Sequence, residues 1–258
     1  MTSNSSELEL PGFRVEVLPE IDSTNSELMR RARCGRLEPV LLVAERQTAG
    51  RGRLGRDWHS DTGSAENRPP SGSLVFSLGL PLLAHDWSGL SLAVGVSIVR
   101  SLHPDLRLKW PNDVWWQSRK LAGILVETVS WGDTRYAVVG VGINIEKPLA
   151  TGLATAPAWL AELLPDLDAP RTLRRIAAPL VQALKAFEAH GFGPWQAGFN
   201  ERDALHGLTI SLSDGTTGIA QGVDSVGALQ VHTAQGWKKI SSSEVSVRPL
   251  NPRPGENR

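Results

Sequence analysis

A glycine- and arginine-rich segment follows directly after an apolar run in the first quarter of the chain. Residues 40–44 (Val-Leu-Leu-Val-Ala) have the composition of a buried strand, and residues 48–58, called here the Gly/Arg loop, then interleave glycine with arginine. Glycine lets a backbone approach a ligand closely, and a planar guanidinium group binds carboxylate or phosphate through two parallel hydrogen bonds. The segment therefore predicts an anion-binding loop, with an exposed basic turn as the alternative.

The spacing of Gly50, Gly52 and Gly55 matches the dinucleotide-binding fingerprint, but its context does not. That fingerprint needs a helix directly after the glycines, so that pyrophosphate meets the helix N-terminus. Residues 57–72 are instead rich in Asp, Ser, Gly and Pro, which is the composition of a loop. A P-loop is excluded as well, because no Gly-Lys-Ser/Thr ending follows.

The charge balance and the single cysteine limit the classes of partner and compartment. Lys plus Arg and Asp plus Glu both number 27, so the net charge of zero argues against nucleic acid as the main partner. Cys34 stands alone and the first residues lack the features of a signal peptide, which indicates a reducing, cytoplasmic location. No apolar run reaches the roughly 20 residues that span a bilayer, so no membrane partner is expected.

The pattern of apolar residues predicts one large and one small domain. Thr24 and Glu27 form a capping-box pattern before a short helix that ends at Gly35. Further strands are expected at 13–17, 74–80, 106–110, 121–129 and 136–145, and helices at 88–103 and 171–190. Short β-rich pieces alternate with turns after residue 207, as in a small barrel. The predicted division is a polar tail at 1–11, a large domain at 12–205, a β-barrel domain at 206–250 and a tail at 251–258.

Two more segments could carry chemistry. Residues 109–113 (Lys-Trp-Pro-Asn-Asp) end one expected strand, and residues 120–127 (Lys-Leu-Ala-Gly-Ile-Leu-Val-Glu) begin the next, so we predict a hairpin with Lys109 and Lys120 near its loop. The apolar strand at 139–144 contains two glycines, which indicates close approach by a ligand or a neighbouring strand. Taken singly, a solvated lysine, a turn-stabilising Asn or Asp and a bulge glycine are the alternatives.

Taken together and in this order, these motifs strongly resemble biotin protein ligase. They are Ser23-Thr24-Asn25, Gln47 with the Gly/Arg loop, residues 109–113, residues 120–127 and Gly140-Val141-Gly142-Ile143-Asn144. The resemblance runs from about residue 13 to the end of the chain. It implies an α+β fold: a mixed β-sheet flanked by helices, like that of class II aminoacyl-tRNA synthetases, with a small C-terminal SH3-like β-barrel. The helix-turn-helix of bifunctional members is not expected, so the resemblance is to the monofunctional type, without DNA as a partner.

The activity that the resemblance implies has two steps. Biotin and ATP form biotinyl-5′-AMP and pyrophosphate, and biotin then passes to one lysine of a biotin carboxyl carrier protein, such as that of acetyl-CoA carboxylase. Bringing a carboxylate to an α-phosphate needs fixed positive charge, and Mg²⁺ is expected to enter with ATP because no metal-ligand cluster appears. The oligomeric state, monomer or homodimer, is left open. A lipoate-protein ligase-like acyl transferase and a non-enzymatic nucleic-acid-binding module are the alternative functions.

The resemblance also assigns residues within the predicted catalytic domain. The expected catalytic residues are Lys120, Arg51, Arg53 and Asp113, of which Asp113 would receive the acceptor lysine. The expected biotin-binding residues are Ser23, Thr24, Asn25, Gln47, Arg51, Gly52, Arg53, Lys120 and Gly123. The expected ATP- or adenylate-binding residues are Arg53, Arg56, Trp58, Asn112, Lys120 and Asn144. Trp110 is expected in the biotin pocket, and the Gly/Arg loop and part of 146–160 are expected to be less ordered than the sheet.

Overall fold

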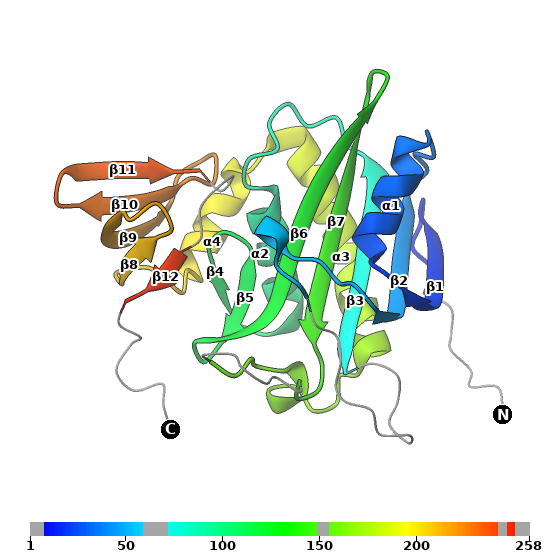
Figure 1. Ribbon diagram of the computed structural model, residues 1–258, viewed down its shortest axis with the longest axis horizontal. Coiled ribbons are helices and arrows are strands. Elements are labelled where there is room, and N and C mark those ends of the chain that lie inside the picture. The colour runs from blue at the N-terminus through cyan, green and yellow to red at the C-terminus, as the bar shows by residue number, and fades with distance from the viewer. Residues whose placement is uncertain (1–7, 59–71, 149–154, 242–246, 251–258) are drawn as a thin grey trace.

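The computed structural model describes residues 8–58, 72–148, 155–241 and 247–250 (Figure 1). The polar connection expected between 61 and 72 lies almost wholly outside these ranges, as do residues 149–154 of the segment expected to be less ordered. None of the described helices combines the length and the apolar character needed to cross a bilayer.

A seven-stranded mixed sheet forms the centre of the molecule, in the order β1-β2-β3-β7-β6-β5-β4. Its strands are β1 (Arg14–Ile21), β2 (Val40–Gln47), β3 (Ser73–Pro81), β4 (Arg107–Lys109), β5 (Asp113–Trp116), β6 (Arg119–Trp131) and β7 (Thr134–Asn144). β1 and β2 pair in parallel and the other neighbours pair antiparallel. The central strands β3 and β7 are almost continuously buried, because helices cover both faces of the sheet there.

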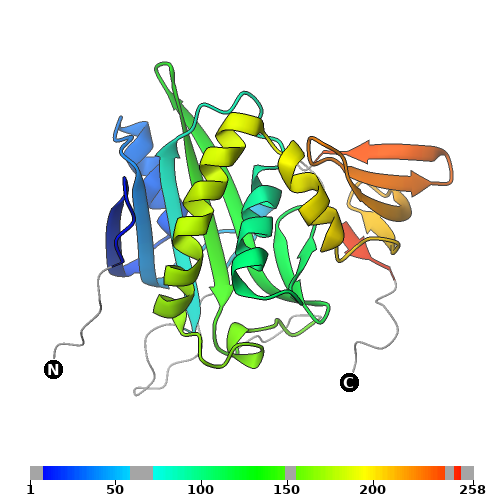
Figure 2. The ribbon, with the colours of Figure 1, turned by 180° about the vertical axis from the view of Figure 1, so that it is seen from behind.

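The helices lie on opposite faces of this sheet. They are α1 (Thr24–Arg33), α2 (Leu90–Leu102), α3 (Ala169–His190) and α4 (Gln196–Glu201), with short 3₁₀ turns η1 (Arg53–Gly55), η2 (Leu160–Glu162) and η3 (Gly193–Trp195). α2 and α3 lie side by side across one face (Figure 2), and α1 lies on the other (Figure 1). α2 is apolar on nearly every side because it is enclosed by α3 and the sheet. α1 is amphipathic and buries Leu28, Met29 and Ala32 against Tyr136 and Val138.

A second sheet follows α4, beyond the β4 edge of the first (Figure 1). Its strands are β8 (Thr209–Leu212), β9 (Thr217–Val223), β10 (Leu229–Thr233), β11 (Gly236–Ile240) and β12 (Val247–Pro249). All pairs are antiparallel in the order β11-β10-β9-β8-β12. These five strands stand where the small C-terminal SH3-like β-barrel was predicted, and within the described residues β11 and β12 do not pair with each other.

The two sheets share one hydrophobic core. Buried side chains of the second sheet, such as Ile210 and Val231, belong to the same cluster as those of the first. β4 is hydrogen-bonded to the segment that leads from α4 to β8: the Leu108 amide donates to the Arg202 carbonyl at 2.8 Å, and the Ala204 amide donates to the Leu108 carbonyl at 2.8 Å. Residues far apart in sequence are thereby joined into one body.

Trp110 lies at this junction and not in the pocket where it was predicted. Its side chain is completely buried, and its Nε1–H donates to the Gly227 carbonyl at 3.1 Å. The prediction was wrong because Lys109 is the residue that lines the cavity, whereas the next side chain, Trp110, is buried in the core and reaches the loop between β9 and β10. Trp110 therefore fastens the second sheet to the first.

Three local predictions also need correction. The N-cap of α1 is Ser23 and not Thr24, because the Ser23 hydroxyl accepts the Ser26 amide while Thr24 begins the helix. Lys109 and Lys120 are not on adjacent arms of a hairpin: β5 pairs with both β4 and β6, so a three-stranded meander separates them. Leu10, within the predicted polar tail, is buried in the core.

Candidate active site

A cavity of about 250 Å³ lies where α1, the Gly/Arg loop, β6, β7 and β12 meet. Apart from Trp110, all but one of the residues predicted to form the site line this cavity. They are Ser23, Thr24, Asn25, Gln47, Arg51, Gly52, Arg53, Arg56, Trp58, Asn112, Asp113, Lys120 and Gly123. Asn144 is the exception: it is buried, and its Nδ2 donates to the Ala158 carbonyl at 2.9 Å. Segments separated by about 100 residues thus converge on one site.

One end of the cavity is made of neutral hydrogen-bonding groups at the start of α1. The Thr24 amide and hydroxyl donate to Gln47 Oε1 at 2.8 and 3.1 Å. The Ser77 hydroxyl, buried on β3, lies 2.7 Å from Thr24 Oγ1 and 2.6 Å from Asn25 Oδ1. A Cβ at Gly140 would overlap Asn25 Oδ1, so this glycine makes room for a side chain of α1 and not for a neighbouring strand. This end can bind a neutral polar group that both donates and accepts.

An aromatic ring covers the middle of the cavity. The Trp58 indole lies against the backbone of β6 and β7: a Cβ at Gly142 would overlap the ring, and one at Gly123 would lie 3.2 Å from it. The Lys120 ammonium is 5.6 Å from the ring centroid, within cation–π range. The glycines of both strands therefore leave a flat space that an aromatic side chain fills.

The Gly/Arg loop holds Trp58 there by folding back on itself. The Trp58 amide donates to the Gly50 carbonyl at 2.9 Å, and the Gly52 amide donates to the Arg56 carbonyl at 2.7 Å. A Cβ at Gly50 would overlap the Trp58 carbonyl, so closure of the loop requires glycine at this position. Gly55, at the end of η1, has φ of 69°, the left-handed region that glycine adopts without cost.

The other end of the cavity is strongly positive. The cations that line it are Arg51, Arg53, Arg56, Lys109, Lys120 and Arg248. Among the described residues, only the carboxylates of Asp57 and Asp113 line it, and Asp113 Oδ1 lies 2.7 Å from the Lys120 ammonium. Burial lowers the pKa of Lys109, and burial also lowers that of Arg53, in both cases against the attraction of Asp113. A bound anion would relieve this cost of crowding cations away from water.

Asn112 lines the cavity and is hydrogen-bonded to β6. Its Nδ2 donates to the Ile124 carbonyl at 2.7 Å, and the Ile124 amide donates to the Asn112 carbonyl at 3.0 Å. The turn before β5 is thereby fixed to β6, which carries Lys120. Among the residues that the structure describes, no group of three or more His, Cys, Asp or Glu side chains could hold a metal ion.

Comparison with known proteins places this site in a family. Residues 17–144 match the model of the Biotin/lipoate A/B protein ligase family, and residues 209–248 match the Biotin protein ligase C terminal domain. The chain is 35% identical over 253 residues to the Bifunctional ligase/repressor BirA of Escherichia coli, a match that covers 93% of this chain and 76% of that protein. The chain belongs to the biotin protein ligase family.

Further members agree in sequence and in structure. The Biotin--[acetyl-CoA-carboxylase] ligase of Mycobacterium tuberculosis is 32% identical over 258 residues, covering 91% of this chain and 89% of that protein. The biotin protein ligase of Aquifex aeolicus, solved in complex with biotin and ATP, superposes with a TM-score of 0.76 at 29% identity and covers 91% of this chain. The fold predicted for a biotin protein ligase, a mixed sheet with helices followed by a C-terminal antiparallel sheet, is confirmed.

Sequence reasoning missed two residues that line this cavity, Lys109 and Arg248, and one behind it, Ser77, which hydrogen-bonds to Thr24 and Asn25. Ser77 is a polar residue inside an apolar strand, a signal that could have identified it. Lys109 was noted in its motif but given no role, although it lines the cavity. Arg248 had no local signal at all, because only the docking of β12 beside the first sheet brings it to the cavity.

Proposed function

We propose that this protein is an ATP-dependent biotin protein ligase. It forms biotinyl-5′-AMP from biotin and ATP and then transfers biotin to a lysine of a biotin carboxyl carrier protein, such as that of acetyl-CoA carboxylase. The observation that carries the proposal is the division of one cavity into a neutral hydrogen-bonding end and a cationic end. Biotin has the matching division, because its bicyclic urea is neutral and its carboxylate is the group that reacts.

The residues at the neutral end bind the urea of biotin in this proposal. Thr24 and Gln47 offer a hydroxyl and a carboxamide, and Ser23 and Asn25 complete the set of donors and acceptors at the start of α1. The apolar tail of biotin then runs alongside the Trp58 ring toward Lys120, past Gly123. This direction brings the carboxylate into the cationic end.

Adenylation takes place at the cationic end. The biotin carboxylate attacks the α-phosphorus of ATP, a bond to the α-phosphoryl group forms, and pyrophosphate leaves with the bonding electrons. Lys120 and Arg53 stabilise the negative charge that builds up there, and Arg56 and Asn112 bind the nucleotide. Mg²⁺ bound to the ATP phosphates would add further positive charge beside these residues.

The transfer step uses Asp113, the carboxylate that forms an ion pair with Lys120. The acceptor lysine must be neutral to attack the acyl carbon of biotinyl-5′-AMP, and AMP is the leaving group. Asp113 lines the cavity beside the reacting groups and takes up the proton that the amine loses.

The exposed free thiol of Cys34 agrees with a reducing cytoplasmic location for this reaction.

One assay tests the function. The protein is mixed with Mg-ATP, an apo carrier domain and either biotin or lipoate, and the mass of the carrier is measured. We expect a mass increase by one biotinyl group with biotin and none with lipoate. A gain in carrier mass with lipoate alone would favour the lipoate-ligase alternative. ATP-independent, salt-sensitive binding of nucleic acid without any gain in mass would favour a non-enzymatic module.

Lys120→Ala should abolish pyrophosphate release while thermal unfolding stays unchanged.

A further inference from the structure

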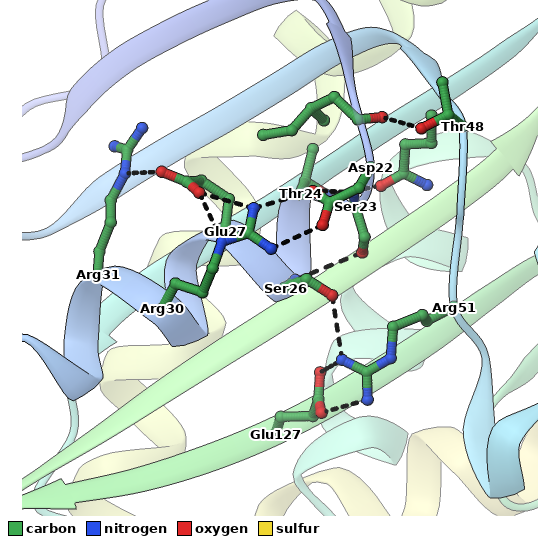
Figure 3. A network of polar contacts seen from close by, with 12 residues as sticks. Asp22, Ser23, Thr24, Ser26, Glu27, Arg30, Arg31, Thr48, Arg51 and Glu127 are labelled. Carbon is green, nitrogen blue, oxygen red and sulfur yellow. Dashed lines mark hydrogen bonds and ion pairs between the residues drawn. The ribbon is translucent and has the colours of Figure 1, made fainter.

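Glu127 on β6 holds two residues of the cavity without lining it itself. Its Oε2 accepts a hydrogen bond from Asn25 Nδ2 at 3.0 Å. Arg51 Nη1 donates to the same oxygen at 3.3 Å, and Arg51 Nη2 donates to Oε1 at 2.9 Å (Figure 3). The Glu127 side chain is 20% exposed, against 47% for Arg51. Asn25 and Arg51 both line the cavity, so this half-buried carboxylate stands behind them.

Arg51 is thereby fastened to three parts of the fold. Its Nη1 also donates to the Ser26 hydroxyl of α1 at 3.3 Å (Figure 3). Its backbone forms a β-bridge with Asp57 at the far end of the Gly/Arg loop. The end-on pair with Glu127 balances the charge of Arg51 in the ligand-free protein. Arg51 thus differs from Arg53 in its environment. Arg51 is paired with Glu127, whereas burial lowers the pKa of Arg53 against the attraction of Asp113.

We propose that Glu127 is a positioning residue that closes the Gly/Arg loop by clasping Arg51, and that Arg51 acts through this closure and not by neutralising the phosphoryl group. The inference rests on the proposed ligase function, because it assigns the loop the task of retaining the acyl adenylate. An acyl phosphate hydrolyses in water, so a loop fastened to β6 and α1 keeps the intermediate in the cavity until the acceptor lysine arrives. The carboxylate also orients Asn25, which couples the loop to the neutral end of the cavity.

The clasp predicts a specific pattern among variants. Glu127→Ala and Arg51→Ala should each release preformed biotinyl-5′-AMP roughly tenfold faster, and the double variant should be no worse than either single one, because both remove the same interaction. The rate of adenylate formation should fall less than about threefold in each. Glu127→Gln retains the size of the side chain and an acceptor for Asn25 but loses the charge, so it should show the faster release without any loss of folding.

A matched control is the exposed ion pair between Arg46 and Glu20, whose closest atoms are 2.6 Å apart. It joins β1 and β2 outside the cavity, so Glu20→Gln should leave adenylate formation and release unchanged. The proposal is overturned if Arg51→Ala slows adenylate formation far more than Glu127→Ala does, or if Glu127→Ala tightens biotin binding. Both results would mean that Arg51 supplies charge to the ligand and that Glu127 competes for it.

A second measurement is independent of catalysis. Trypsin cleaves after arginine, and Arg53 and Arg56 lie in the Gly/Arg loop. In the ligand-free protein, Glu127→Gln should raise the rate of cleavage at these residues roughly fivefold relative to the unaltered protein and to Glu20→Gln. Equal cleavage rates overturn the clasp. If the unaltered protein forms no adenylate, the proposed function fails, while the cleavage rates still decide whether Glu127 holds the loop.

Discussion

Gly142 shows how a single missing side chain shapes the cavity, because the Trp58 ring occupies the place of its Cβ. We expect Gly142→Ala to push Trp58 and the end of the Gly/Arg loop outward. Its biotin affinity, measured by calorimetry, should fall about tenfold or more, while the free energy of unfolding changes by less than about 1 kcal/mol because only a movable side chain is displaced.

The control for this change is Gly193→Ala in η3, where a Cβ would have no neighbour closer than 4.0 Å. That variant should bind biotin as the unaltered protein does. Unchanged affinity in Gly142→Ala would mean that Trp58 does not cover the bound ligand.

Lys109 illustrates the opposition between stability and function at one residue. Burial lowers its pKa from the ordinary value, so charging this lysine costs folding energy at neutral pH, and the cost disappears as the pH rises to about 10.5. Lys109→Met should therefore raise the melting temperature at pH 7, and the gain should shrink toward pH 10. Adenylate formation should fall by about tenfold or more, because one cation that lines the cavity is lost.

Lys147→Met is the matched control. The Lys109 ammonium lies 5.2 Å from the centroid of the Trp115 ring, and the Lys147 ammonium lies 5.6 Å from that of Trp159, but Lys147 is exposed. It should leave the melting temperature nearly unchanged. If Lys109→Met is no more stable than the unaltered protein at pH 7, desolvation of Lys109 is not a cost to the fold.

The sequence predicted site residues where a motif carries them and failed where only tertiary contact does. Gln47 and Lys120 stand in motifs of distinctive composition, and the structure brings both to the cavity. Glu127 belongs to the same segment as Lys120, but its contacts with Asn25 and Arg51 span 102 and 76 residues. A local sequence pattern cannot show that side chains so far apart in the chain lie close together in the fold.

At the scale of elements, long periodic segments were predictable and short ones were not. The helix predicted at 171–190 corresponds to α3, Ala169–His190, because its apolar face is long and regular. β5 has only four residues, so this segment was predicted to be the loop of one hairpin, whereas it pairs with β4 on one side and β6 on the other. The start of α1 was placed one residue late because Ser23 and Thr24 are both good cap residues, and packing selects between them.

The N-terminal end of α1 carries an ion-pair network that should make stability depend on pH (Figure 3). The hydrogen bond from Arg30 holds the pKa of Asp22 below its ordinary value, and that from Arg31 does the same for Glu27. Carboxyl groups with lowered pKa stabilise the folded state above their unfolded pKa and lose this contribution as the pH falls. We therefore expect the free energy of unfolding to decrease from about pH 5 toward pH 2.

Arg30→Met isolates the contribution of this network. Urea unfolding should show a deficit relative to the unaltered protein at pH 7 that narrows toward about pH 2, as the carboxylates become protonated in both proteins. Arg175→Met serves as control, because Arg175 donates to the neutral Ser101 carbonyl at 2.6 Å and its deficit should not depend on pH in the same range. An Arg30→Met deficit of equal size at both pH values would contradict the assignment.

At the scale of the whole molecule, the second sheet contributes to the wall of the cavity. β12 carries Arg248 to the cavity, while the hydrophobic core continues from the first sheet into the second. Family resemblance predicted the second sheet, but composition could not predict this docking, since it depends on which surfaces are left uncovered after each sheet forms. A shared core also implies that the two sheets unfold together.

Trp110→Phe tests this coupling, because it removes the one hydrogen bond that Trp110 Nε1 donates across the junction to the Gly227 carbonyl. An unpaired buried carbonyl costs about 1–3 kcal/mol, so urea unfolding should shift to lower concentration as a single transition with an unchanged slope. Because β12 then holds its place less firmly, KM for ATP should rise while the neutral end keeps its affinity for biotin. Trp237→Phe, at an indole that is 67% exposed on β11, should change neither quantity. Two separate unfolding transitions in the unaltered protein, or a stability loss in Trp110→Phe without any change in KM, would show that the sheets fold or function independently.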